Sequence, residues 1–331
     1  MRSPAAADSL EAALERAVAR YDDGSATSAQ IRYHLGLSDG ARRGKRLRSR
    51  LVLEVTEEEG GCVEDALDVA CAVEILHEFS LVHDDIEDGD TLRRGRETVW
   101  SRFGIPHGIN AGDALCAIAY LALLDGTTTR SPATTIMMAR ALQQAHLAMC
   151  GGQGRDIAFE TTERVTMTDY RTMIAGKTGA LFGAACELGA LAAGAGGARA
   201  SAYARIGRAY GIAFQIEDDI LGTWGDSATT GKPCGADIAK RKWSFPVVWA
   251  LGGPPSPARE TVAAAYGRSG GLGSDEVAAT IAALDALGAR DAARGAARRE
   301  LDGADEVAAE FSIDRSGRVR AFFNRAVRRV A

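Results

Sequence analysis

The sequence predicts an all-α fold, and three observations support this class. Apolar residues recur at spacings of three and four almost throughout the 331 residues, which is the period of helices with a buried face. No stretch alternates cleanly between apolar and polar residues, as a half-buried strand would. Aromatic residues make up only 6% of this alanine-rich chain and prolines number eight, a composition that favours helix over sheet.

The expected helices follow one another with short breaks marked by glycine and proline. They cover residues 8–21, 45–59, 64–88, 108–124, 132–150, 167–192, 199–223, 244–251, 257–267, 275–310 and 315–329, and the helix over 275–310 is expected to break near Gly288. None of the breaks is long or polar enough to serve as an interdomain linker. Residues 1–331 are therefore expected to form a single domain.

Composition argues against several classes of function. The net charge of −5 and the pI near 5.7 leave no basis for binding nucleic acid through overall charge. The six cysteines are scattered, without a C-x-x-C pair or a histidine cluster, so neither a zinc site nor a disulfide framework is indicated and a cytoplasmic location is expected. No window resembles a signal peptide or a membrane span, so a soluble protein without an integral membrane segment is expected.

A first cluster of acidic residues ends the apolar helix expected at 64–88. The four-residue step from Asp84 to Asp88 places both carboxylates on one helix face, with Asp85 between them. Partly enclosed carboxylates need a cation, and oxygen ligands suit Mg²⁺, which usually shares its remaining sites with substrate phosphates. For one such cluster alone, a solvated helix end explains the pattern equally well.

A second cluster favours the metal interpretation, because Asp218 and Asp219 end another apolar helix. Two such helices facing one another would form a multinuclear metal site able to hold a diphosphate from both sides. Basic residues also adjoin these acids: Arg93, Arg94, Lys232, Lys240, Arg241 and Lys242. Gly44 and the basic residues after it open an earlier helix, where they would make an anion site. Acids and bases in alternation indicate magnesium and pyrophosphate together.

At these residues the chain resembles the trans-isoprenyl diphosphate synthase family, or polyprenyl synthetases. The strings that carry the resemblance lie within residues 43–251 and are GKRLR, HEFSLVHDDIEDGDTLRRG, GKTGALFGAACELGAL, FQIEDDILGTWGD and TGKPCGADIAKRKWSFP. The resemblance implies a helical bundle around a deep apolar cavity, usually in a homodimer. It also implies a prenyltransferase that lengthens an allylic diphosphate with isopentenyl diphosphate and releases pyrophosphate.

The resemblance implies roles for individual residues as well. Three Mg²⁺ ions would be bound by Asp84, Asp88 and Asp218. Asp85 and Asp219 would support these ligands, Asp237 would add an outer contact, and the oxygens of Thr178 and Gln215 would face the developing allylic cation. The cationic contacts to the allylic diphosphate would be Arg93, Lys177, Lys232 and Lys242. The pocket for isopentenyl diphosphate would comprise Lys45, Arg48, His77 and Arg94.

The resemblance implies a reaction in two steps: the allylic diphosphate ionises, and isopentenyl diphosphate then captures the allylic cation. Magnesium and the cationic side chains stabilise the departing pyrophosphate, where charge develops in the transition state, and the double bond of isopentenyl diphosphate attacks the allylic cation. No nucleophilic side chain is required. One departure stands out, because Gly222 occupies the position where the second acidic motif of the family usually has a third aspartate. His83, beside the first motif, is expected to be structural.

Phe79 and Ser80 bear on the length of the product. If Asp84 anchors the diphosphate, the prenyl tail runs toward the start of the helix, and residues four and five positions earlier lie about one turn deeper. In the resembling family, an aromatic residue at the deeper position and a small one at the nearer position are associated with C20 products, so geranylgeranyl diphosphate is expected. A farnesyl diphosphate (C15) synthase, a terpene cyclase of the same fold and a non-catalytic partner subunit stay open as alternatives.

Overall fold

The computed structural model describes residues 4–37, 43–126, 130–226, 234–268 and 270–328. Apart from one short hairpin, the regular elements of these residues are helices, which confirms the all-α class. Contacts divide the chain into two compact units, one formed by residues 1–143 and 184–200 and the other by residues 144–183 and 201–331. The expectation of a single domain over residues 1–331 stays a prediction.

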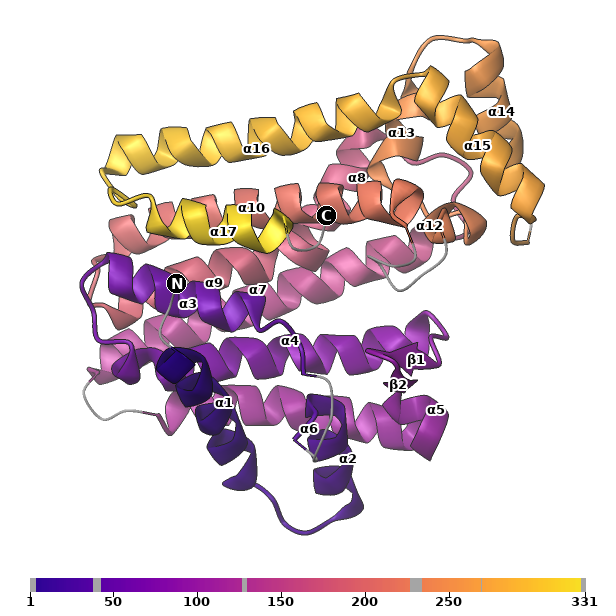
Figure 1. The fold of residues 1–331 in the computed structure, drawn as a ribbon. Helices are drawn as coiled ribbons and strands as arrows, with labels where there is room; N and C mark the ends of the chain where they lie inside the picture. The colour runs from indigo at the N-terminus through magenta and orange to yellow at the C-terminus, as the bar shows by residue number, and fades with distance from the viewer. Residues whose placement is uncertain (1–3, 38–42, 127–129, 227–233, 269, 329–331) are drawn as a thin grey trace. The chain divides into compact units, whose positions relative to one another are not determined.

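The first unit is built around α4, as Figure 1 shows. Its helices are α1 (Pro4–Ala19), α2 (Ala26–Leu35), α3 (Leu47–Glu58), α4 (Leu67–Glu87), α5 (Val99–Phe103) and α6 (Ile105–Leu124). A 3-10 turn, Glu64–Ala66, leads into α4. A two-stranded antiparallel hairpin of β1 (Leu92–Arg93) and β2 (Arg96–Glu97) follows α4.

Three helices carry the chain between the units: α7 (Pro132–Phe159), α9 (Ala180–Ala192) and α10 (Gly197–Trp224). The other helices of the second unit are α8 (Met167–Ile174), α12 (Ala236–Ala239), α13 (Phe245–Gly252), α14 (Pro257–Tyr266), α15 (Ser274–Ala286), α16 (Ala289–Phe311) and α17 (Arg318–Arg328). A π-helical segment, Ala175–Gly179, joins α8 to α9 without a break.

The first half of helix α4 is enclosed on all sides. Every residue from Val69 to Leu76 is buried, and α6 runs alongside α4 (Figure 1). A helix that is apolar on all sides is typical of an element surrounded by neighbours. The buried face continues almost to the end of α4, so its last turn and C-cap keep Asp85 in the interior and bring Asp84 and Asp88 toward the surface.

Helix α6 combines a buried and an exposed apolar face. Within the described residues it is the one helix long and apolar enough to cross a membrane, judged by length and composition alone. Of its most apolar 18-residue stretch, 44% is buried inside the protein. This is weak support for a membrane span, because a core helix of a soluble protein passes the same test. The exposed apolar side chains of α6 are Ile105, Ile109, Leu121 and Leu124.

Several boundaries differ from those expected, and glycine explains two of them. The helix expected to end at 150 continues to Phe159 through Gly151 and Gly152. A Cβ on Gly152 would lie 2.1 Å from the backbone nitrogen of Lys177, so this glycine permits close packing and does not end the helix. The helix expected from 108 begins at Ile105, since Gly104 adopts a positive φ of 98° and Pro106 is tolerated in the first turn.

Other elements were not expected from the sequence at all: α2, the hairpin, α5 and α12. Helix α2 is capped by Ser25 and by the left-handed Gly36, but its polar sequence shows little apolar periodicity. The expected break near Gly288 is confirmed, because Gly288 has a φ of 74° between α15 and α16.

Candidate active site

The first acidic cluster separates outer from inner aspartates at the end of α4. Asp84 is half-exposed and Asp88 is exposed, whereas the side chain of Asp85 is 1% exposed. Both Nε and Nη2 of Arg93, on β1, lie 2.7 Å from Oδ1 of Asp85. Burial raises the pKa of Asp85, and the guanidinium of Arg93 opposes that rise. The hairpin thus pairs Arg93 with the inner aspartate and leaves the outer two toward solvent.

The second cluster repeats this arrangement on α10. Asp218 is exposed, whereas Asp219 is 2% exposed. Oδ2 of Asp219 accepts hydrogen bonds from the hydroxyl of Tyr170 at 2.6 Å and from the backbone N–H of Phe245 at 2.7 Å. Burial raises the pKa of Asp219 to about 6, although Lys242 and these donors act in the opposite sense. The inner aspartate of each cluster is therefore tied to neighbours, and the outer one is accessible.

Asp219 also fixes a polar pair made of Gln215, one turn earlier on α10, and Thr178, on the π-helical segment. Its Oδ1 accepts from Nε2 of Gln215 at 3.0 Å, which directs the amide oxygen of Gln215 to the hydroxyl of Thr178 at 2.7 Å. Because the Thr178 hydroxyl donates its hydrogen to Gln215, its oxygen keeps lone pairs for another partner. The pair can therefore present oxygen to a cation. Tyr170, which anchors the relay through Asp219, was missed, since a lone tyrosine in an amphipathic helix resembles any core residue.

Lys177 lies in the π-helical segment between α8 and α9, a kind of distortion that is frequent at functional sites. Its Nζ is 2.5 Å from Oδ2 of Asp156, near the end of α7. Asp156 was also missed by the sequence reasoning, because the helix that carries it was expected to stop before it. The structure therefore adds an acidic partner to one of the expected diphosphate contacts.

The space beside Gly222 is occupied by another acidic side chain. A Cβ on Gly222 would lie 2.0 Å from Oδ2 of Asp237, on α12. Burial alone would lower the pKa of Lys242, but the carboxylates of Asp237 and Asp219 raise it above its ordinary value. The place where the family usually has a third aspartate therefore holds the carboxylate of Asp237. Lys232 lies outside the described residues.

The residues expected to hold isopentenyl diphosphate belong to the first unit. Lys45 is exposed, and Nη1 of Arg48 lies 3.0 Å from Nε2 of His77. Burial, helped by Arg48, lowers the pKa of His77 well below its ordinary value, so the neutral imidazole accepts from Arg48 through Nε2. Arg94 donates to Glu78 at 2.9 Å. His77 thus holds Arg48 in this structure.

The two residues linked to chain length lie one turn before the first cluster. Phe79 is buried, and its ring makes an edge contact with His83 at a centroid distance of 4.9 Å. Ser80 is half-buried and donates to the carbonyl of His77 at 2.8 Å. His83 packs toward α6, with Nε2 3.3 Å from the carbonyl oxygen of Ile109, and its structural role stays a prediction.

The donor set of the outer aspartates fits magnesium held jointly with a diphosphate. Within the described ranges, no group of three or more His, Cys, Asp or Glu side chains could hold a metal ion by itself. Carboxylate oxygens are hard ligands, and Mg²⁺ commonly keeps one or two of them beside waters and substrate phosphates. Asp84 and Asp218 belong to different units, so their convergence on one site stays a prediction.

Comparisons with known proteins agree with these motifs. A family model described as Polyprenyl synthetase matches residues 37–284. A geranylgeranyl diphosphate synthase from Mycobacterium tuberculosis is 41% identical over 88% of this chain and 83% of its own length. A (2E,6E)-farnesyl diphosphate synthase from Mycobacterium bovis is 38% identical over 86% of this chain and 80% of its own length.

A solved structure shares the fold along nearly the whole chain. It is a geranylgeranyl pyrophosphate synthase from Corynebacterium glutamicum, complexed with isoprenyl diphosphate and magnesium, with a TM-score of 0.83 and 26% identity. The alignment covers 98% of this chain and 98% of that one. The chain is therefore a prenyltransferase that belongs to the polyprenyl synthetase family.

Proposed function

We propose that this prenyltransferase condenses isopentenyl diphosphate with an allylic diphosphate to form geranylgeranyl diphosphate. One observation supports a C20 product: α4 has a buried aromatic ring at Phe79 and a small side chain at Ser80. The names of relatives do not decide the chain length, since one is a geranylgeranyl and another a farnesyl diphosphate synthase.

In this proposal the outer aspartates, Asp84, Asp88 and Asp218, hold three Mg²⁺ ions. When bound, magnesium offsets the negative charge that develops on the departing pyrophosphate. The presence of magnesium and isoprenyl diphosphate in the Corynebacterium glutamicum structure supports this assignment. Asp85 and Asp219 keep Arg93 and Gln215 in place, and the cationic side chains bind the diphosphate. Isopentenyl diphosphate then lies against Lys45, Arg48 and Arg94, beside His77.

The product spectrum of the purified protein tests the proposed function. With Mg²⁺, isopentenyl diphosphate and a C5, C10 or C15 allylic diphosphate, the main product after dephosphorylation and chromatography is expected to be the C20 alcohol. Chelation with EDTA should abolish the reaction. A C15 alcohol would indicate the farnesyl alternative, and a hydrocarbon or alcohol made from geranylgeranyl diphosphate alone would indicate a cyclase. No pyrophosphate release from any starter would favour a non-catalytic subunit.

The chain-length assignment predicts opposite effects for two substitutions. Phe79→Ala should deepen the cavity beneath the tail and lengthen the product beyond C20. Ser80→Phe should place a ring nearer the diphosphate and shorten the product to C15. Chromatography of the products checks both, and chain lengths identical to wild type would contradict the assignment.

We further propose that Asp237 serves in place of the third aspartate that Gly222 replaces. Gly222→Asp should crowd two carboxylates together, and Asp237→Gly should leave none, so each is expected to weaken Mn²⁺ binding with pyrophosphate and lower kcat by about 10- to 100-fold. The double variant returns one carboxylate to the same space, so it should recover most of the Mn²⁺ affinity and most of kcat. Electron paramagnetic resonance of bound Mn²⁺ checks the affinity without turnover. A double variant no better than the worse single variant would refute the exchange.

We also propose a homodimer as the working assembly, and the exposed large apolar residues of α6 support it. Exposed apolar surface that is rimmed by polar residues marks interaction sites when it is contiguous. Light scattering is expected to give twice the mass of one chain, and a double substitution of Ile109 and Leu124 by Glu should give the monomer. Trp249→Glu, at another exposed apolar residue on α13, is the control and should leave the mass unchanged. A wild-type monomer would rule out this assembly.

A cytoplasmic location is part of the same proposal. All six cysteines lie within the described residues, and none of them forms a disulfide. This agrees with a reducing compartment.

A further inference from the structure

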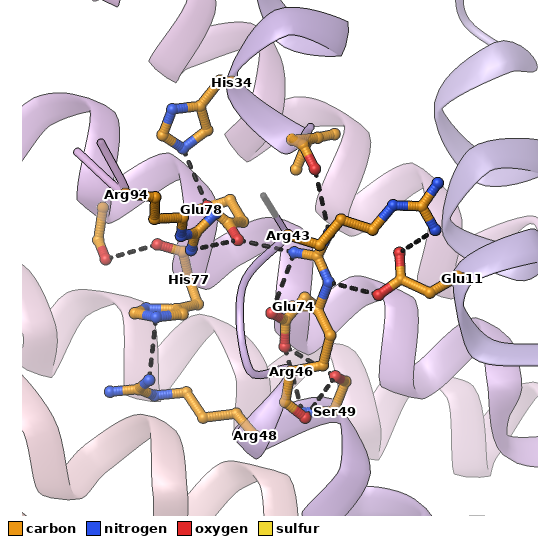
Figure 2. Close-up of polar contacts among 12 residues, drawn as sticks. Glu11, His34, Arg43, Arg46, Arg48, Ser49, Glu74, His77, Glu78 and Arg94 are labelled. Atoms are coloured by element: carbon orange, nitrogen blue, oxygen red, sulfur yellow. Dashed lines mark hydrogen bonds and ion pairs between the residues drawn. The ribbon is translucent and has the colours of Figure 1, made fainter. Parts of the chain in front are cut away.

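A buried charge cluster surrounds Glu78 on α4 (Figure 2). The side chain of Glu78 is 0% exposed. Its Oε1 accepts hydrogen bonds from Nη1 of Arg46 at 2.7 Å and from Nη2 of Arg94 at 2.9 Å, and its Oε2 lies 3.0 Å from Nε2 of His34. One carboxylate therefore connects α2, the segment that precedes α3, and the turn of the hairpin.

Glu78 is ionised in this cluster. Burial alone would raise its pKa, but His34 and Arg94 lower it well below its ordinary value. A buried ion whose partner is removed leaves an uncompensated charge, which is strongly unfavourable. The carboxylate therefore constrains where the two guanidinium groups can lie.

Both arginines that meet at Oε1 have a left-handed backbone. The φ of Arg46 is 51° and that of Arg94 is 54°. Arg94 and Gly95, with a φ of 78°, form the two-residue turn between β1 and β2, and such tight hairpin turns need a positive φ at both positions. Left-handed conformations are unfavourable for residues other than glycine and persist where contacts of the side chain or surroundings impose them.

The segment before α3 passes close to Arg94 at Gly44. A Cβ on Gly44 would lie 2.7 Å from Nη2 of Arg94 and 3.3 Å from Oε1 of Glu78. The absence of a side chain at Gly44 thus leaves room for the Nη2 end of the guanidinium, which Glu78 engages. Nη1 of Arg94 is enclosed and has no hydrogen-bond partner among the described residues, while the Arg94 side chain as a whole is 23% exposed. Glu78 therefore engages only part of a guanidinium that an anion can still approach from the exposed side.

We propose that Glu78 is a positioning residue of the isopentenyl diphosphate pocket. By engaging Nη2, it fixes the direction of the Arg94 guanidinium, so that the N–H groups on the exposed side of this side chain can donate to a diphosphate oxygen of isopentenyl diphosphate. The inference rests on the proposed function, because the role of Arg94 is assigned there. The alternative is that Glu78 only neutralises the buried Arg46.

Glu74 provides a matched control for that alternative. It lies one turn earlier on α4, its side chain is 2% exposed, and it accepts from Ser49 at 2.7 Å and from Arg46 at 3.4 Å. Among the described contacts Arg94 pairs with Glu78 and not with Glu74. Glu74→Gln therefore removes the same charge from beside Arg46 and leaves the partner of Arg94 in place.

The test compares Glu78→Gln with Glu74→Gln by calorimetric titration of isopentenyl diphosphate without an allylic substrate, and by steady-state kinetics. Glu78→Gln is expected to weaken isopentenyl diphosphate binding and raise its KM by about 10- to 100-fold, with the KM of the allylic diphosphate unchanged. Glu74→Gln should lower the melting temperature without this selective loss. Equal losses of isopentenyl diphosphate affinity in the two variants would overturn the proposal.

A double-mutant cycle shows whether Glu78 acts through Arg94. Arg94→Gln should weaken isopentenyl diphosphate binding by itself, and Glu78→Gln should add no further loss in that background. Fully additive losses would also overturn the proposal. If Glu78→Gln does not fold, Gly44→Ala replaces it in the test. Its added methyl group should displace the Arg94 guanidinium without removing a charge, and should therefore weaken the binding of isopentenyl diphosphate.

Wild-type protein separates this inference from the proposed function. If wild type neither binds isopentenyl diphosphate nor forms product, the proposed function fails and the inference falls with it. If wild type does both and Glu78→Gln behaves like Glu74→Gln, only the positioning role of Glu78 is refuted.

Discussion

An ionised carboxylate inside a protein needs opposite charge or hydrogen-bond donors around it, and this requirement organises the site. Three buried acids show it: Asp85 with Arg93, Asp219 with Tyr170, and Glu78 with Arg46 and Arg94. In each case a partner of the buried acid is, or directly supports, a group expected to contact substrate. The inner acids therefore fix the positions of their partners, and the acids next to them, Asp84, Asp88 and Asp218, are the more exposed ones.

The fold class and the acidic clusters could be predicted because both are local properties of the sequence. Helical periodicity and the spacing of Asp84 from Asp88 can be read within one or two turns. Tyr170 and Asp219 are 49 residues apart and Lys177 and Asp156 are 21 apart, so no local pattern joins them. The same limit explains α7, because Gly152 is a helix break in sequence and a close-packing residue only once Lys177 lies against it.

The replacement at Gly222 shows why a departure from a motif has to be judged in three dimensions. Read along the chain, the second acidic motif has lost a carboxylate. In the structure, Asp237 reaches the same space from α12, because Gly222 has no side chain to exclude it. If Asp237 serves as proposed, a carboxylate near Lys242 comes from a different element, which a motif confined to one helix does not register.

The Glu78 cluster raises the question of why a protein interior would keep linked charges. Replacing a buried ion pair with well-packed apolar residues is often neutral or stabilising, so stability alone is a poor reason to retain this one. Two of its arginines also adopt left-handed backbone conformations, which add a further free-energy cost of about 1–3 kcal/mol each. An apolar replacement could fill the same volume, but it could not hold the Nη2 edge of Arg94 in one direction. The arrangement is explained if its purpose is the placement of a guanidinium, for which a fixed and fully paired carboxylate is the suitable partner.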